Sequence, residues 1–285
     1  MQIQFKNISK TITTILVLSL GTYAYLTSEG YVDDPLNIIE RDAGTDDSNS
    51  KTLSKASQNA TESSNSSNTI TDWSNTSASV NGVEIPAFDG QNDAYVLNDG
   101  EPFFTSEDLV YTETYINFSD LDSLGRAGVA NAVVGQETMQ THDRGSISDI
   151  HPSGWWEAKQ TDVNVNRSHL IGNNLYGDIT DCTENMITGS RQLNAGGTFE
   201  GSMLQYEIQL ANYLEDTGNH VRYRVTPVFE NNDATCKGVL MEAESLEDGG
   251  AGLKFCVYIY NVQDEYTCDY QTGVWEKVTT ASVLE

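Results

Sequence analysis

The pattern of apolar and polar positions separates a polar N-terminal part from a C-terminal part with regular elements. The clearest element is a helix predicted over 203–217, because apolar residues recur there every three or four positions and Gly218 can end it. Alternation over 220–225 predicts a strand that Thr226 and Pro227 bring to an end.

Shorter apolar runs on both sides of this helix predict further strands. They cover 129–134, 164–170, 238–244 and 253–260, and the last two are joined by a Gly-rich turn. Breakers such as Pro and Gly indicate a loop over 141–156. Strands on both sides of one long helix predict an α+β domain with a mainly antiparallel central sheet.

The first residues have the pattern of an export segment. Lys6 and Lys10 precede an apolar run of about 15 residues over 12–26. A full membrane span needs roughly 20 residues, and no clean cleavage site follows the run. We therefore expect residues 1–28 to be either a signal peptide or a membrane anchor, and the protein to be secreted or anchored at the cell surface.

A polar linker is expected after this segment. Residues 44–79 consist almost wholly of Ser, Thr, Asn, Asp and Ala, which cannot bury enough apolar surface to offset the loss of chain entropy. We predict a disordered linker over 29–80 and one folded domain over 81–285.

The cysteines do not form a zinc motif, because none is arranged as CxxC or CxH. Disulfides are compatible with an exported protein. Cys236 and Cys256 lie on or beside strands expected to be hairpin neighbours, so they are the predicted pair. The two remaining cysteines are Cys182 and Cys268.

A net charge of −27, from 42 acidic and 15 basic residues, argues against a tight, non-specific coat on nucleic acid. A nucleic-acid enzyme with this charge would have to rely on a few local cations and a metal ion. The acidic surface also suits high salt, where screening shortens the repulsion.

The strongest chemical signal lies at 166–172 and 185–194. His169 precedes Leu-Ile-Gly, and Asn194 follows it by 25 residues on a predicted helix. An imidazole that deprotonates water and a neutral oxygen ligand for a hydrated divalent ion are the requirements of a metal-assisted phosphodiesterase.

The other three histidines and two glutamates on a predicted strand are not assigned catalytic roles. His142 and His151 fall in a predicted loop and are expected to be solvated, whereas His220 begins a strand and is expected to be structural. Glu242 and Glu244 lie on one strand face instead of across a cleft, which argues against a glycosidase with paired carboxylates.

Eight collinear segments between 85 and 275 resemble the DNA/RNA non-specific endonucleases, in particular the secreted or membrane-anchored bacterial branch typified by streptococcal DNases and DNA-entry nucleases. They are LDSLGRAGVA (121–130), RGSISDIHPSGW (144–155), NRSHLIG (166–172), ENMITGSRQLN (184–194), MLQYE (203–207), NHVRYRVTPVF (219–229), GVLMEAESLEDGG (238–250) and YNVQ (260–263).

The resemblance implies a ββα-metal core with flanking helices. His169 would be the general base, and Asn194 would be the direct protein ligand of Mg²⁺, with Mn²⁺ as an alternative ion. Mg²⁺ keeps several waters and needs few protein ligands. Asn185 and Glu207 match positions that orient these waters or the base, and Asn166 would help to hold the histidine by a hydrogen bond.

Basic and acidic residues complete the implied site. Arg191 and Glu207 join His169 as expected catalytic residues. Arg167 and Arg144 are expected to bind the substrate phosphates.

The motif departs from the family's usual Asp-Arg-Gly-His. Asn166 and Ser168 stand at the Asp and Gly places, and a side chain at Ser168 costs energy if the backbone there needs a positive φ. The literal Asp-Arg-Gly at 143–145 is followed by Ser146, not by His, and is interpreted as a decoy.

The resemblance implies an extracellular, Mg²⁺-dependent hydrolase that cuts DNA, and also RNA, without sequence preference. Expected partners are the nucleic acid, the membrane if the first segment is retained, and an inhibitor protein. The acidic charge and the altered motif keep one alternative open, a catalytically weak or inactive nuclease scaffold that binds DNA or a partner at the cell surface.

Overall fold

The computed structural model describes residues 73–142, 145–196 and 200–278, all within one compact unit, Thr69–Glu285. The expected signal or anchor segment, most of the expected linker, and Arg144 lie outside the described residues. In the described ranges, no helix has the length and apolar character needed to cross a membrane.

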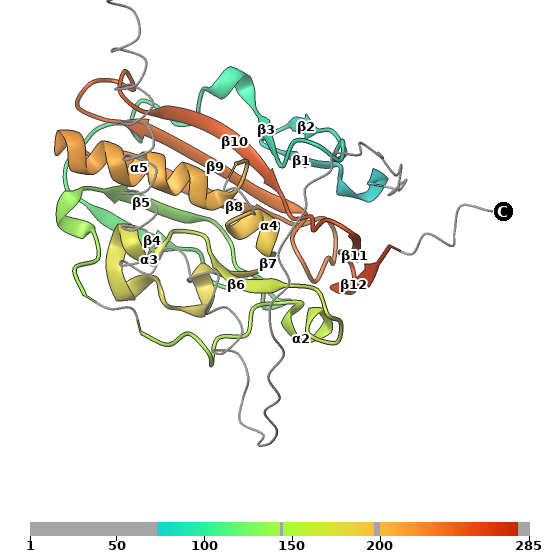
Figure 1. Cartoon of the computed structure of the whole chain (residues 1–285). Coiled ribbons are helices and arrows are strands. Elements are labelled where there is room, and N and C mark those ends of the chain that lie inside the picture. The colour runs from blue at the N-terminus through green and yellow to red at the C-terminus, as the bar shows by residue number, and fades with distance from the viewer. Residues whose placement is uncertain (1–72, 143–144, 197–199, 279–285) are drawn as a thin grey trace, which may run out of the picture. The chain divides into compact units, whose positions relative to one another are not determined.

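A six-stranded antiparallel sheet forms the centre of this unit (Figure 1) and confirms the predicted α+β class. Its strand order is β3-β10-β9-β8-β5-β4. The strands are β3 (Ala94–Val96), β4 (Tyr115–Phe118), β5 (Ala130–Val134), β8 (Val221–Val228), β9 (Gly238–Ser245) and β10 (Lys254–Tyr260).

The prediction that Thr226 and Pro227 end the strand of residues 220–225 was wrong. Strand β8 continues to Val228, and Pro227 lies opposite Val239 of β9. On the other side, β5 pairs with β8 only as far as Val225. Proline has no backbone N–H to donate. Because β5 does not extend alongside Pro227, no hydrogen bond to β5 is lost there, and the proline is tolerated.

The predicted helix is present as α5 (Met203–Thr217), which covers one face of the sheet (Figure 1). Gly218 ends it in the left-handed conformation with φ of 68°. Leu210 and Leu214 are fully buried against sheet residues such as Met241. Burial of each leucine side chain contributes about 1.5–3 kcal/mol to the free energy of unfolding. The largest apolar core lies between α5 and this face of the sheet.

A smaller apolar core lies on the opposite face of the sheet. It is built partly by the hairpin of β1 (Ala78–Val80) and β2 (Val83–Ile85), where Ala78 and Ile85 pack with Leu240. A described strand therefore lies before residue 81, the domain boundary expected from composition.

Short elements complete the unit. A third core joins Trp155 and Trp275, which are both buried. The remaining elements are β6 (Val165–His169), β7 (Met186–Ser190), β11 (Tyr266–Asp269), β12 (Val274–Lys277), α2 (Trp155–Ala158), α3 (Asn173–Tyr176), α4 (Arg191–Asn194), and 3₁₀ turns at Ser74–Thr76, Asn98–Gly100, Gln136–Thr138, Gly177–Thr180 and Thr183–Asn185.

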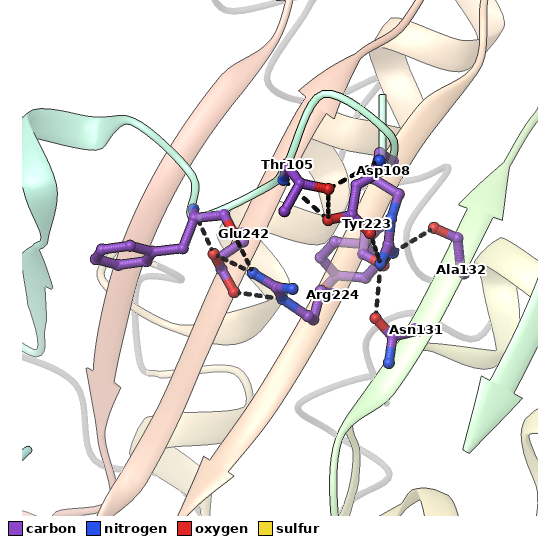
Figure 2. Close-up of polar contacts among 9 residues, drawn as sticks. Thr105, Asp108, Asn131, Ala132, Tyr223, Arg224 and Glu242 are labelled. Atoms are coloured by element: carbon purple, nitrogen blue, oxygen red, sulfur yellow. Dashed lines mark hydrogen bonds and ion pairs between the residues drawn. The ribbon is translucent and has the colours of Figure 1, made fainter. Parts of the chain in front are cut away.

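A buried ion pair lies on the sheet face opposite α5 (Figure 2). The guanidinium of Arg224 makes two bonds to the Glu242 carboxylate, of 2.7 and 2.8 Å. The carboxylate also accepts the Phe103 N–H at 2.8 Å, and the Phe103 carbonyl accepts a bond from Arg224 at 3.2 Å. These bonds fasten the segment before β4 onto the sheet.

Arg222 extends this charged cluster toward β5. It donates to the Ala132 carbonyl at 3.1 Å and to the Asn131 amide oxygen at 2.7 Å, and lies 3.5 Å from Asp108. Burial of Asp108 opposes its ionisation. Hydrogen bonds from Thr105 and the charges of Arg222 and Arg224 outweigh burial and lower the pKa of Asp108.

The predicted disulfide between Cys236 and Cys256 is wrong, because all four thiols are free. Cys236 packs in the core beneath α5, whereas Cys256 packs on the opposite face of the sheet. Two residues on opposite faces cannot meet. Burial raises the pKa of both thiols to about 12.

Substitution of Glu242 tests how much the buried Arg224–Glu242 ion pair stabilises the fold. Glu242 has no exposed surface, so Glu242→Gln leaves the Arg224 charge without its partner and is expected to lower the free energy of unfolding by about 3–5 kcal/mol. Urea denaturation measures the loss. Glu265→Gln, in the exposed pair with Lys277, is the matched control and should leave the midpoint unchanged. Equal effects of the two substitutions would contradict the structural role of the buried pair.

Candidate active site

Strands β6 and β7 and helix α4 form a ββα unit within the predicted motif. The strands pair antiparallel, with His169 opposite Met186 and Val165 opposite Ser190. The Ser190 hydroxyl accepts the Leu193 N–H at 2.9 Å and caps α4. The motif histidine and asparagine therefore lie on elements of one unit.

His169 is paired with a carboxylate that the sequence did not reveal. Its Nε2 lies 2.7 Å from Oδ1 of Asp181, and both side chains are largely buried, with exposed fractions of 9% and 13%. A carboxylate in this position orients the ring and stabilises the imidazolium. Asp181 lies 12 residues after His169 in an irregular segment, so no spacing pattern marks it.

Asn185 holds the chain directly after His169. Its backbone carbonyl accepts the Leu170 N–H at 2.8 Å, and its side-chain oxygen accepts the Ile171 N–H at 3.0 Å. Its Nδ2 donates to the carbonyls of Ile171 and Thr180, both at 2.9 Å. The Asn185 side chain is therefore fully used on backbone groups.

Glu207 reaches the same segment from α5. It is 92% buried, with 8% exposed, and accepts the Gly172 N–H at 2.9 Å. A Cβ at Gly172 would lie 2.8 and 2.9 Å from the two carboxylate oxygens, so glycine permits this approach. Burial, and then the charge of Glu207, raise the pKa of Tyr223. The structure thus brings His169, Asn185 and Glu207 together around residues 169–172.

The substituted motif positions are accommodated without backbone strain. Ser168 is not among the described residues with positive φ, and it occupies an ordinary position in β6. Across the hairpin, a Cβ at Gly189 would lie 2.3 Å from the Ser168 hydroxyl oxygen. The absence of a side chain at Gly189 therefore makes room for Ser168. The Asn166 side-chain oxygen is buried and has no hydrogen-bond partner among the described residues.

Arg191 and Asn194 lie at the two ends of α4. Within the described ranges, neither side chain forms a hydrogen bond or ion pair, including with His169. An amide oxygen is a ligand that Mg²⁺ accepts, so Asn194 fits the expected metal role chemically. No cluster of three or more His, Cys, Asp or Glu residues suited to a metal occurs in the part of the chain that the structure describes.

Arg167 is directed into the loop that precedes α2. Its guanidinium donates to the Ile150 carbonyl at 2.5 Å and to the Ser148 carbonyl at 2.8 Å. The group also lies 4.1 Å from the centre of the Trp155 ring. Arg167 thus fixes the loop to β6, while its charge has no acidic partner within the described residues.

Unpaired cations gather at this unit. In the described ranges, ion pairs to carboxylates neutralise Arg126, Arg222, Arg224, Lys237, Lys254 and Lys277. The described basic residues that lack such a pair are Lys159, Arg167 and Arg191. Arg167 and Arg191 belong to the ββα unit, and Lys159 packs on Trp155, which Arg167 contacts. The chain is acidic overall but keeps free positive charge here.

The remaining histidines lie elsewhere. His220 is held between Glu247 at 2.5 Å and Glu137 at 3.1 Å; burial opposes its protonation, but these two bonds outweigh it and raise its pKa. His142 forms an exposed contact with Asp178 at 3.2 Å. His151 is exposed, as expected of a loop, and stacks on Trp156.

Comparisons with known proteins point to one family. Residues 107–247 match the family described as DNA/RNA non-specific endonuclease. The crystal structure of NucA from Streptococcus agalactiae with bound magnesium ion is similar at 26% identity and a TM-score of 0.57, covering 65% of this chain and 87% of that one. The Sda1 nuclease with bound zinc ion shares the fold at 21% identity and a TM-score of 0.54, over 65% of this chain and 96% of that one. Among curated proteins, no match was found.

The contact between Ser168 and Gly189 can be tested by a double-mutant cycle. Gly189→Ala places a methyl group against the Ser168 hydroxyl and is expected to lower the free energy of unfolding by about 1–3 kcal/mol. Adding Ser168→Gly removes the clash and should recover most of this loss. Thermal or urea unfolding measures all four proteins. Additive effects in the double variant would show that the two positions are independent.

Proposed function

Because residues 107–247 belong to the DNA/RNA non-specific endonuclease family, we propose that the ββα unit hydrolyses phosphodiester bonds of DNA and RNA with the help of a divalent cation. The observation that carries this proposal is the His169–Asp181 pair at the end of β6, in a unit that retains unpaired cations. We further propose that the protein acts outside the cytoplasm, with residues 1–28 as its signal or anchor.

In this mechanism His169 accepts a proton from the attacking water. The Asp181 carboxylate, 2.7 Å away, holds the ring in position and stabilises the positive charge that forms on it. Asn185 and Glu207 hold residues 170–172 by their backbone N–H groups and thereby set the position of His169. They are proposed as positioning residues.

Asn194 is proposed to hold the divalent ion. Its amide is not engaged by another described residue, and the magnesium ion bound to NucA, a similar structure, supports this ion class. When bound, the ion would neutralise charge that develops on the phosphate and on the leaving oxygen. Arg191, one helical turn away on the same helix, is proposed to bind a phosphate oxygen.

The unpaired cations explain how an acidic protein can bind a polyanion. Lys159, Arg167 and Arg191 are local charges, whereas the 42 acidic residues are spread over the whole sequence. At physiological salt the Debye length is about 8 Å, so distant acidic groups are screened more than close contacts. Contacts with phosphates carry no sequence information, which accounts for low base specificity.

Plasmid cleavage by the full chain tests the general base. His169→Ala is expected to reduce the rate by about 10²- to 10⁴-fold, while the fold is retained by circular dichroism. His142→Ala, which alters an exposed histidine, should cut like the unmodified protein. Cleavage that survives His169→Ala, or a wild-type rate that is unaffected by EDTA, would contradict the proposed mechanism.

The metal role of Asn194 predicts a separate change. Asn194→Ala should raise the Mg²⁺ concentration that gives half-maximal cleavage by at least about tenfold, because the ion loses its direct protein ligand. The metal dependence of the rate is measured beside that of Asn174→Ala, a neighbouring exchange of the same kind outside α4. An unchanged Mg²⁺ requirement would assign Asn194 another role.

A further inference from the structure

An exposed aromatic pair lies beside the ββα unit and has no role in the mechanism above. Trp156 exposes 62% of its surface, although a side chain of this size contributes most to stability when it is buried. The His151 ring stacks on it, with ring centres 4.5 Å apart and planes inclined by 24°. We name His151 and Trp156 the aromatic platform.

The platform rests on a rigid base. The residue before Trp156 is Trp155, which is 3% exposed and packs in the core with Trp275. Gly154, with φ of 73°, directly precedes α2 as its N-cap and lies against Thr235, where a Cβ would come within 2.2 Å of the Thr235 hydroxyl oxygen. This packing fixes the α2 backbone that carries Trp156.

Arg167 connects the platform to the strand of the proposed base. Its guanidinium stacks on Trp155 and binds the carbonyls of Ser148 and Ile150, in the loop that leads to His151. Arg167 and His169 are two positions apart on β6, so they share a strand face at a spacing of about 7 Å. This spacing is close to the distance between successive phosphates of an extended nucleic-acid strand.

Charge complements the aromatic surface. Lys159 lies 5.2 Å from the Trp155 ring centre, and Lys159 and Arg167 have no acidic partner among the described residues. Aromatic faces stack on unpaired bases, and adjacent cations bind the phosphates that connect those bases. Paired bases within a duplex do not offer their faces to a side chain.

We propose that the aromatic platform stacks on an unpaired nucleobase of the substrate strand, next to the phosphodiester bond that is cut. The platform then favours single-stranded or locally opened nucleic acid over intact duplex. The inference rests on the proposed nuclease function, and it names the substrate form that the site holds best.

Binding in EDTA tests the platform without cleavage. The full chain is titrated into a labelled single-stranded DNA 12-mer at low salt, and the dissociation constant is measured by fluorescence anisotropy. Trp156→Ala should weaken binding roughly 5- to 100-fold, which corresponds to the loss of one base stacked on an aromatic ring. Trp156→Phe should retain most of the affinity. Tyr95→Ala, which removes an exposed aromatic ring on β3, is the matched control and should have no effect.

An oligonucleotide that lacks bases separates stacking from a general effect on the fold. Abasic sites should weaken binding to the wild-type chain and have little further effect on Trp156→Ala. The proposal would be overturned if Trp156→Ala lost as much affinity for the abasic strand as for the normal strand, or if Trp156→Ala kept the wild-type affinity.

Cleavage assays distinguish this inference from the proposed function. With Mg²⁺, Trp156→Ala should lower kcat/KM for single strands far more than for duplex. If the wild-type chain cuts neither form, the nuclease proposal fails while the anisotropy result still decides whether the platform binds bases. Equal loss of kcat/KM on both substrates would refute the preference for unpaired strands.

Discussion

The short segment 169–172 is the constraint on which the candidate site depends. Two buried side chains from different elements bind its backbone, Asn185 from the turn before β7 and Glu207 from α5. Since α5 packs on the central sheet, these bonds connect the ββα unit to the main core. The packing of α5 on the sheet therefore helps to set the position of His169, because the buried Glu207 carboxylate of α5 binds the Gly172 N–H. The absence of a side chain at Gly172 leaves room for that carboxylate.

Much of the fold could be predicted from local sequence patterns, and the rest depended on distant contacts. The bounds of α5 followed from its apolar periodicity and from Gly218, and both agree with the structure. The end of β8 was misjudged, because tolerance of Pro227 depends on where the neighbouring strand stops. Strand β1 has a polar, Ser-rich context, and only its pairing with β2 and its burial against the sheet make it part of the domain.

In the candidate site, too, local sequence patterns predicted some features and distant contacts decided the others. His169, Asn185, Asn194 and Glu207 were named through a motif and a resemblance, and the structure gathers three of them around one segment. Asp181 was missed because its place beside His169 is created by a turn of irregular structure. The aromatic platform was missed because the sequence does not show that the His151 and Trp156 rings stack on each other.

The bonds between Phe103 and the buried Arg224–Glu242 pair have a consequence for the order in which this chain can fold. Phe103 and Glu242 are 139 residues apart, and β3 pairs with β10, whose last residue is Tyr260. Contacts this distant in sequence form late and slow the folding of a domain. The early part of the domain leaves the ribosome first, yet it has no completed sheet to join until nearly the whole chain has been made. Synthesis therefore delivers a chain that is still unable to complete its fold, which is the state that the proposed export through a narrow channel would require.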